Sequence, residues 1–268
     1  MSFHASYSLK LGLLVLGGML NAAEPQIPPQ IFARKNEIKL FVTPANTEQA
    51  IAALKLDASK AVEQTVCFFD TADGALESQN LILRARQKDA EPGESTVKLR
   101  AIAGTTHLSE AERAIRPEQD WTHESSPTLS RSMDWASIET GLVTRIATGE
   151  GKVRELFNAD QQNLVMARMR DFNWESLKRY GPVMAQVWRE HRTLDGFKEK
   201  VTIEHWHLEK DGRSLEVLEI SAKAKADTEA HAQALAKQFF EAAKAAGLGE
   251  PSGQTKTKQV LEFFKPGR

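Results

Sequence analysis

Two short stretches of the chain decide its fold: residues 81–87 read LILRARQ and residues 95–102 read STVKLRAI. In each stretch apolar and polar residues alternate with a period of two, which is typical of a half-buried β-strand. Side chains two positions apart in a strand point to the same face. The alternation therefore places basic residues together, opposite a face of Leu, Val and Ala: Arg84, Arg86, Lys98 and Arg100.

The same alternation recurs in six other runs along the chain: residues 37–43, 63–70, 112–120, 183–189, 198–208 and 214–223. Asp211-Gly212 predicts a tight hairpin between the last two runs. Helical spacing predicts helices over 47–56, 132–142, 152–160 and the Ala-rich stretch 228–247. Strands and helices that follow one another without βαβ alternation predict an α+β fold with an antiparallel sheet or barrel.

The charged strand faces allow two interpretations. In an ordinary antiparallel sheet with one solvated face, the charged residues would lie in water. If the sheet closes into a barrel and helices cover the apolar face, the charged residues would line the interior. An interior rich in Arg and Lys suits a polyphosphate, because guanidinium and ammonium groups bind phosphate oxygens well. The formal net charge is only −1, which gives no reason to expect nucleic-acid binding or attraction to an anionic membrane.

Several short motifs, in the same order along the chain, resemble those of a known family. Glu37-Ile38-Lys39 is similar to the second half of an E-x-E-x-K motif, and the FDT of residues 69–71 precedes the LILRAR segment. Residues 96–100 (TVKLR), 116–120 (RPEQD) and 255–258 (TKTK) match further motifs. On these residues the chain resembles the CYTH, or triphosphate tunnel metalloenzyme, superfamily. The resemblance implies a closed antiparallel β-barrel (tunnel) of eight strands with surrounding helices.

The resemblance also implies a function and a set of site residues. The family's tunnel binds a triphosphate or a triphosphorylated organic molecule, with hydrolysis that depends on Mg²⁺ or Mn²⁺. The implied catalytic residues are Lys39, Arg84 and Arg86. The implied ligand-binding residues are Lys98, Arg100, Arg116, Arg189, Lys200 and Lys256. The implied metal ligands are the carboxylates of Glu37, Glu118, Asp120, Glu204 and Glu219.

Two positions depart from the family pattern. The first Glu of the E-x-E-x-K motif falls on Lys35, and the first Glu of a later acidic strand falls on Val217. Because carboxylates are the usual ligands of hard divalent ions, both changes weaken the metal-holding side of the site. Three functions stay open: a triphosphatase, a non-catalytic protein that binds a polyphosphorylated ligand, and a tunnel that serves as a scaffold for a protein partner.

The N-terminus has the pattern of a signal peptide. Lys10 precedes the short apolar run 11–20, and small residues end at Ala23. A positive region, a short apolar region and a small-residue site are typical of a cleaved secretory signal. We therefore expect 1–23 to be a signal peptide, 24–34 an extended leader, and 35–268 the tunnel domain, with a partly helical insertion at about 125–182. The mature protein would then be periplasmic or secreted, without a stable membrane anchor.

Other candidate sites are weaker. Cys67 is the only cysteine, so it cannot form an intramolecular disulfide, and its apolar surroundings favour a buried position. His205 and His207 share a strand face and could bind a metal, but no third ligand is spaced to complete a zinc site. The sequence contains no phosphate-binding Walker loop and no dinucleotide-binding glycine motif.

Overall fold

The structure, a computed structural model, describes residues 32–43, 46–88, 90–101, 108–192, 194–248 and 254–265. All of these belong to one structural unit that begins at Phe32. The predicted signal peptide (1–23) and residues 24–31 of the predicted leader lie outside the described residues. Within the described residues, no helix has both the length and the apolar character that crossing a membrane requires.

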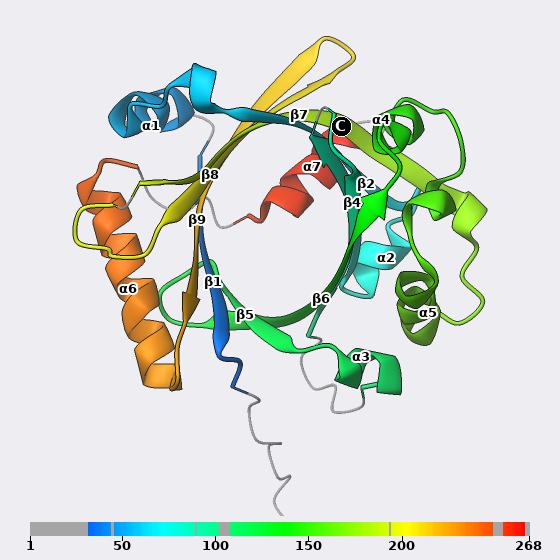
Figure 1. Cartoon of the computed structure of the whole chain (residues 1–268), viewed down its shortest axis with the longest axis horizontal. Coiled ribbons are helices and arrows are strands. Elements are labelled where there is room, and N and C mark those ends of the chain that lie inside the picture. Colours follow the sequence, from blue (N-terminus) through cyan, green and yellow to red (C-terminus); the bar gives the residue numbers. More distant parts are fainter. Residues whose placement is uncertain are drawn as a thin grey trace, which may run out of the picture. The chain divides into compact units, whose positions relative to one another are not determined.

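The strands of the described residues close into a barrel (Figure 1). They are β1 (Lys35–Val42), β2 (Val62–Thr71), β3 (Leu81–Lys88), β4 (Gly93–Arg100), β5 (Pro117–Trp121), β6 (Pro127–Ile138), β7 (Leu177–Arg192), β8 (Val201–Lys210) and β9 (Arg213–Lys225). The order around the barrel is β1-β5-β6-β4-β3-β2-β7-β8-β9, and β9 pairs with β1. The predicted barrel in an α+β fold is confirmed, but it has nine strands instead of eight, and β1 pairs with β5 in parallel.

The additional strand is β6, which takes up most of the stretch 132–142 that was predicted to be helical, so this prediction was wrong. Its neighbours β4 and β5 both pair with it in antiparallel fashion. The residues that β6 turns into the barrel are Ser130, Ser132 and Asp134, all polar, whereas its outward residues are of mixed character. Hydrophobic periodicity therefore could not reveal the strand, because neither face is consistently apolar.

Most of the helices cover the outside of the barrel, on two sides (Figure 1). The helices are α1 (Thr47–Leu54), α2 (Ala75–Ser78), α3 (Glu110–Ala114), α4 (Leu142–Ala147), α5 (Ala159–Arg168), α6 (Glu229–Ala245) and α7 (Lys256–Phe264), with short 3-10 turns at Ala58–Lys60, Val153–Leu156 and Trp174–Ser176. Residues 125–182, the predicted partly helical insertion, contain β6, α4 and α5 before β7 begins. Helix α3 replaces the first part of the strand predicted over 112–120, because Ser109 and Glu112 form a capping box there.

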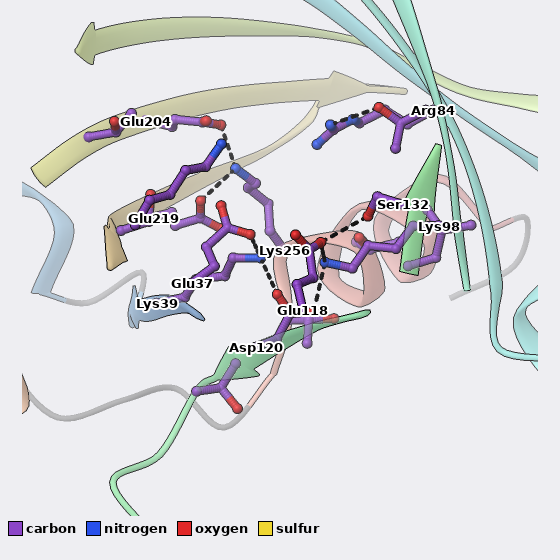
Figure 2. Close-up of a pocket in the computed structure, with 18 of the residues that line it drawn as sticks. Glu37, Lys39, Arg84, Lys98, Glu118, Asp120, Ser132, Glu204, Glu219 and Lys256 are labelled. Atoms are coloured by element: carbon purple, nitrogen blue, oxygen red, sulfur yellow. Dashed lines mark hydrogen bonds and ion pairs between the residues drawn. The ribbon is translucent and has the colours of Figure 1, made fainter. Parts of the chain in front are cut away.

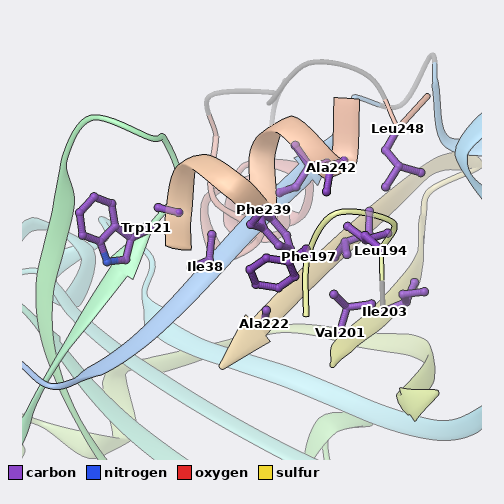
Figure 3. Close-up of a cluster of buried hydrophobic side chains, with 14 of the residues drawn as sticks. Ile38, Trp121, Leu194, Phe197, Val201, Ile203, Ala222, Phe239, Ala242 and Leu248 are labelled. Atoms are coloured by element: carbon purple, nitrogen blue, oxygen red, sulfur yellow. The ribbon is translucent and has the colours of Figure 1, made fainter. Parts of the chain in front are cut away.

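The apolar faces of the strands point outward, so the hydrophobic cores lie between the barrel and its helices. On one side Ile38, Ile203 and Ala222 pack against Phe239 of α6 (Figure 3). On the other side Leu83 and Val97, together with residues of α4 and α5, form a second core. Burial of these side chains closes the sheet and leaves its charged face toward the interior.

Helix α7 packs inside one end of the barrel. Its Val260 and Leu261 belong to a third apolar cluster with Phe68, Trp206 and Val217, which lie on the inner face at that end. Val217, the position where an acidic residue was expected, is fully buried in this cluster. An apolar side chain at position 217 therefore contributes to the surface on which α7 packs.

Candidate functional site

The barrel interior holds a cavity of about 650 Å³ whose wall is mostly charged (Figure 2). The alternation of each strand explains this wall, because the residues between the outward apolar positions all face inward. Almost all of the predicted site residues line it: Glu37, Lys39, Arg84, Arg86, Lys98, Arg100, Glu118, Asp120, Arg189, Lys200, Glu204, Glu219 and Lys256. Arg116 does not, since it is exposed and lies just before β5 outside the cavity lining.

Strands β3 and β4 form the cationic side of the cavity. Arg84 donates to Thr96 Oγ1 at 3.2 Å and has no carboxylate partner among the described residues. Arg86 pairs with Glu94 at 2.7 Å. Burial, helped by the neighbouring charge of Arg86, lowers the pKa of Arg84 below its ordinary value. An incoming anion would relieve this unfavourable burial of charge, so Arg84 is well placed to bind one.

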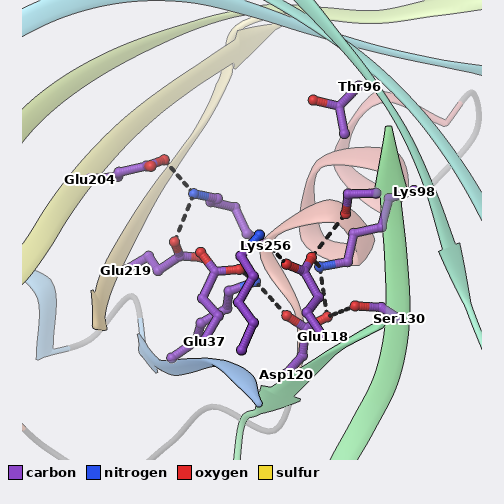
Figure 4. A network of polar contacts seen from close by, with 12 residues as sticks. Glu37, Thr96, Lys98, Glu118, Asp120, Ser130, Glu204, Glu219 and Lys256 are labelled. Atoms are coloured by element: carbon purple, nitrogen blue, oxygen red, sulfur yellow. Dashed lines mark hydrogen bonds and ion pairs between the residues drawn. The ribbon is translucent and has the colours of Figure 1, made fainter. Parts of the chain in front are cut away.

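On the opposite side, Glu37, Glu118 and Asp120 form a three-carboxylate group (Figure 4). Each residue contributes one carboxylate oxygen to a set in which all lie within 4.8 Å of one another. Glu37 comes from β1, and Glu118 and Asp120 come from β5, so the parallel pairing of these two strands brings the three together. Such a set of oxygen atoms can hold a hard divalent cation.

Three lysines and two serines already contact the three-carboxylate group. Lys39 Nζ lies 2.7 Å from Glu37 Oε2 and 3.2 Å from Asp120 Oδ1. Lys98 Nζ lies 2.6 Å from Asp120 Oδ2 and 3.3 Å from Glu118 Oε1. The remaining contacts are those of Lys35 Nζ with Glu118 Oε2 at 2.7 Å, Ser130 Oγ with Asp120 Oδ2 at 2.8 Å, and Ser132 Oγ with Glu118 Oε1 at 2.9 Å. Only Glu37 Oε1, of the six carboxylate oxygens, has no contact of this kind within the described part of the chain.

These contacts control the protonation of the group. Burial alone would raise the pKa of Glu37, but the ammonium groups of Lys39 and Lys98 outweigh it and hold this pKa far below its usual range. The pKa of Asp120 and that of Glu118 are lowered in the same way against the effect of burial. All three side chains are therefore ionised at neutral pH.

Glu204 of β8 and Glu219 of β9 form a second, two-carboxylate group around Lys256 of α7. Lys256 Nζ lies 2.5 Å from Glu204 Oε2, 3.2 Å from Glu219 Oε1 and 4.0 Å from the centre of the Trp206 ring. Burial would raise the pKa of Glu204, but Lys256 and the arginines of β3 lower it to about 2. For Glu219 burial prevails, and its pKa is raised above the ordinary value.

Sequence reasoning missed several polar residues of the wall. Thr96 lines the cavity and donates to Asp134 Oδ1 at 2.7 Å, and Ser130 and Ser132 donate to the acidic residues of β5. The signal that could have revealed them is alternation: Thr96 shares a strand face with Lys98 and Arg100, and Ser130 and Ser132 share one with Asp134. His205 and His207 lie away from the cavity lining and contact Glu216 instead.

Comparison with known proteins agrees with this geometry. The model of the CYTH domain family matches residues 33–257, which is most of the chain. The chain belongs to the CYTH domain family. The family assignment first made on short motifs is therefore confirmed, while export of this CYTH domain stays a prediction.

Solved structures share the fold of this CYTH domain at low sequence identity. A candidate adenylate cyclase from Bacillus halodurans has a TM-score of 0.51 and 16% identity, with coverage of 86% of this chain and 99% of the other. A candidate adenylyl cyclase from Hippeastrum, described as having a dominant triphosphatase activity, has a TM-score of 0.50 and 19% identity, with coverage of 85% and 95%. Among curated protein sequences, no match was found.

Proposed function

We propose that this CYTH domain binds a triphosphate inside the barrel and hydrolyses it with the help of a divalent metal ion. The observation that carries the proposal is the placement of Arg84, which has no carboxylate partner among the described residues, in the same cavity as a three-carboxylate group. Cations bind the phosphate oxygens, and the carboxylates hold the metal. The triphosphatase activity described for the structural relative from Hippeastrum is consistent with this proposal.

The carboxylates fit a hard divalent ion such as Mg²⁺ or Mn²⁺ by their chemistry and mutual distances. Glu37, Glu118 and Asp120 would hold it after Lys35, whose side chain is 59% exposed, moves away from Glu118. When bound, the ion supplies Lewis-acid stabilisation of the negative charge that develops on the phosphoryl oxygens. Arg84 and Lys39 neutralise the phosphate chain and fix its position, as is usual for phosphoryl transfer.

Hydrolysis adds one water molecule across the bond between the terminal phosphorus and the bridging oxygen. The water oxygen bonds to phosphorus, the bridging oxygen leaves with the electron pair, and the water's proton must pass to a base. Glu219 lines the cavity, and burial raises its pKa, so we assign it the role of proton acceptor. The products are orthophosphate and the shortened phosphate chain.

A binding assay with tripolyphosphate tests the proposal. We expect the ligand to raise the melting temperature, and phosphate to be released on addition of Mg²⁺ or Mn²⁺. Arg84→Ala should weaken binding at least tenfold, since a hydrogen bond from a charged group contributes about 1.5–3 kcal/mol. Arg116→Ala is the matched control, because this arginine is exposed outside the cavity lining. An unchanged affinity in Arg84→Ala would contradict the assignment of this wall.

A second candidate function is binding without hydrolysis. It is favoured by the lysines and serines that already contact five of the six oxygens of the three-carboxylate group, since a metal must displace some of them. In that case tripolyphosphate would raise the melting temperature, while no phosphate would be released with either metal. The two functions are therefore separated by one assay on one protein.

We also propose that the protein acts outside the cytoplasm. The support is the signal-peptide pattern of residues 1–23, with Lys10 before a short apolar run. Sequencing of the N-terminus of the exported protein should begin at Glu24. A protein that begins at Met1 would contradict this location.

A further inference from the structure

A cluster of histidines and glutamates lies on the outer face of the hairpin formed by β8 and β9. Glu204 of β8 points into the barrel cavity, so the alternation of the strand turns its neighbours on either side outward. In the register of the hairpin, an outward histidine of β8 lies directly opposite a glutamate of β9. We call the set of outward residues that meet here the histidine cluster: His205, His207, Glu209 and Glu216.

The carboxylate of Glu216 lies between the two imidazoles of the histidine cluster. Its Oε2 lies 2.5 Å from His205 Nε2, and its Oε1 lies 2.5 Å from His207 Nδ1. Both His205 Nε2 and Glu216 Oε2 are buried, and neither makes a well-formed hydrogen bond within the described residues. Two electron-rich atoms so close together repel each other unless a proton or a metal ion lies between them. The contact of these two atoms therefore points to a bound cation.

The protein itself supplies no fixed cation to the histidine cluster. In the part of the chain that the structure describes, Glu209 and Glu216 form ion pairs with the two histidines alone, and no lysine or arginine contacts them. The residues of β7 that pair with the two histidines are Gln186 and Met184, which are uncharged. A metal ion that enters here displaces no ammonium group, whereas one that enters the three-carboxylate group must do so.

The donor atoms of the histidine cluster suit zinc. His205 Nε2, His207 Nδ1 and the carboxylate of Glu216 give two nitrogen donors and one oxygen donor, a combination that Zn²⁺ binds in proteins. The other ring nitrogen of His207, Nε2, lies 2.8 Å from Glu209 Oε1. A carboxylate at this second nitrogen fixes the orientation of a metal-binding imidazole. The side chains of His207 and Glu216 are 42% and 39% exposed, so a water molecule can take the fourth position around the ion.

We propose that the histidine cluster is a zinc site on the outer face of the barrel, with His205, His207 and Glu216 as its ligands. Glu209 acts as a positioning residue that orients the ring of His207. Zinc holds its ligand atoms about 2.0–2.2 Å from itself, so the side chains must rotate from their present contacts to admit the ion. The site differs in chemistry from the three-carboxylate group of the barrel, whose oxygen donors suit Mg²⁺ or Mn²⁺.

The place of the site indicates what the ion would do. Trp206 lies between the two histidines in the sequence and points to the opposite face, where its ring centre lies 4.0 Å from Lys256 Nζ. Its Nε1 donates to Glu204 Oε2 at 3.0 Å. Zinc would therefore join β8 to β9 and stabilise the hairpin that carries part of the barrel wall, without touching a ligand in the cavity.

Calorimetric titration of the full chain with Zn²⁺ tests the inference, after treatment with a chelator and at about pH 8, above the ordinary pKa of histidine. We expect one tightly bound zinc ion per chain. Glu209→Gln should weaken its binding about tenfold, which is the usual cost of losing the partner of a metal-binding imidazole. His205→Gln and His207→Gln each remove a direct ligand and should weaken it further. His231→Gln, at an exposed residue of α6, is the matched control and should leave the affinity unchanged.

Three outcomes would overturn the inference. The first is the absence of zinc binding to the wild-type protein, and the second is an unchanged affinity in both His205→Gln and His207→Gln. The third is a loss of zinc binding in Glu118→Gln and not in the histidine variants, which would place the ion in the barrel. If His205→Gln does not fold, the more exposed His207→Gln gives the test alone. No phosphate ligand is used, so none of these outcomes bears on the proposed function of the barrel.

Discussion

The two groups of carboxylates on the barrel wall are neutralised in different ways. The three-carboxylate group contacts three ammonium groups, from Lys35, Lys39 and Lys98, and all of them come from β1 and β4 of the barrel itself. The two-carboxylate group contacts one ammonium group, that of Lys256, which comes from α7. The first group is therefore balanced within the barrel, whereas the second depends on a helix that packs into it.

This difference shows on which elements the stability of each group depends. Glu204 and Glu219 face each other across β8 and β9, and the register pairs them directly. Two like charges at such a position destabilise a sheet unless a cation lies between them. Lys256, which is 7% exposed, supplies that cation. In the three-carboxylate group, by contrast, the charges are already compensated, and Lys35 is more exposed than its partners.

The largest expected effect is the loss of the one cation of the two-carboxylate group. Lys256→Met should destabilise the protein by about 3–5 kcal/mol, because it leaves two buried carboxylates without their partner. Urea unfolding of the variant and of Lys258→Met, an exposed position on the same helix, measures the difference. A loss below about 1 kcal/mol would show that α7 is held by its apolar residues alone.

A smaller effect is expected from acid. The pKa of Glu204 is lowered from 4.5 to about 2, so its stabilising contribution is complete above pH 4.5 and disappears as the pH falls toward 2. The shift corresponds to about 3 kcal/mol. Glu219 has the opposite sign: because its pKa is raised in the folded protein, its ionised form destabilises the fold, and this unfavourable contribution disappears as the pH falls and the group takes up a proton.

Unfolding free energies between pH 7 and pH 2 test this assignment. Glu204→Gln should flatten the decline below pH 4.5, whereas Glu63→Gln, at an exposed residue of β2, should leave the curve unchanged. If both variants follow the wild-type curve, Lys256 does not stabilise the ionised form of Glu204.

Much of the barrel could be predicted from the sequence because its apolar face is regular. In β3 the buried residues Leu81, Leu83 and Ala85 alternate with Arg84 and Arg86, so the strand and the direction of its charges were both visible. The hairpin at Asp211-Gly212 was equally predictable, because Asp-Gly favours a two-residue turn. The structure confirms it, since both residues have a positive φ and join β8 to β9. Strand β6 could not be found in this way, because its outward residues are of mixed character and give no regular apolar face.

The composition of the site was predicted better than its contacts. The sequence places Glu37, Glu118 and Asp120 on inward faces, but it cannot show that β1 and β5 pair in parallel and bring the three within 4.8 Å. Lys35 was interpreted as a missing carboxylate, whereas the structure shows it in contact with Glu118. Val217 was interpreted in the same way and instead packs near α7. Such contacts depend on tertiary register, which short motifs do not encode.

The smallest expected effect concerns Lys35. It tests whether the Lys35 ammonium group competes with a metal ion for the three-carboxylate group or only neutralises the charge of that group. Lys35→Ala should change stability by less than about 1 kcal/mol, because the Lys35 side chain is 59% exposed and Lys98 still contacts Glu118 when Lys35 is removed. It should, however, tighten the binding of Mn²⁺ on the order of tenfold, since a single charge about 5 Å from a divalent ion contributes about 1.7 kcal/mol at the dielectric constant of water.

The Mn²⁺ affinity is measured by electron paramagnetic resonance without any phosphate ligand. Lys225→Ala is the matched control, because Lys225 pairs with Lys35 in the register of β1 and β9, is equally basic and exposed, and makes no ion pair among the described residues. An equal gain in both variants would mean that only the general field of the barrel end matters, and no gain in either would mean that Lys35 does not compete for the three-carboxylate group.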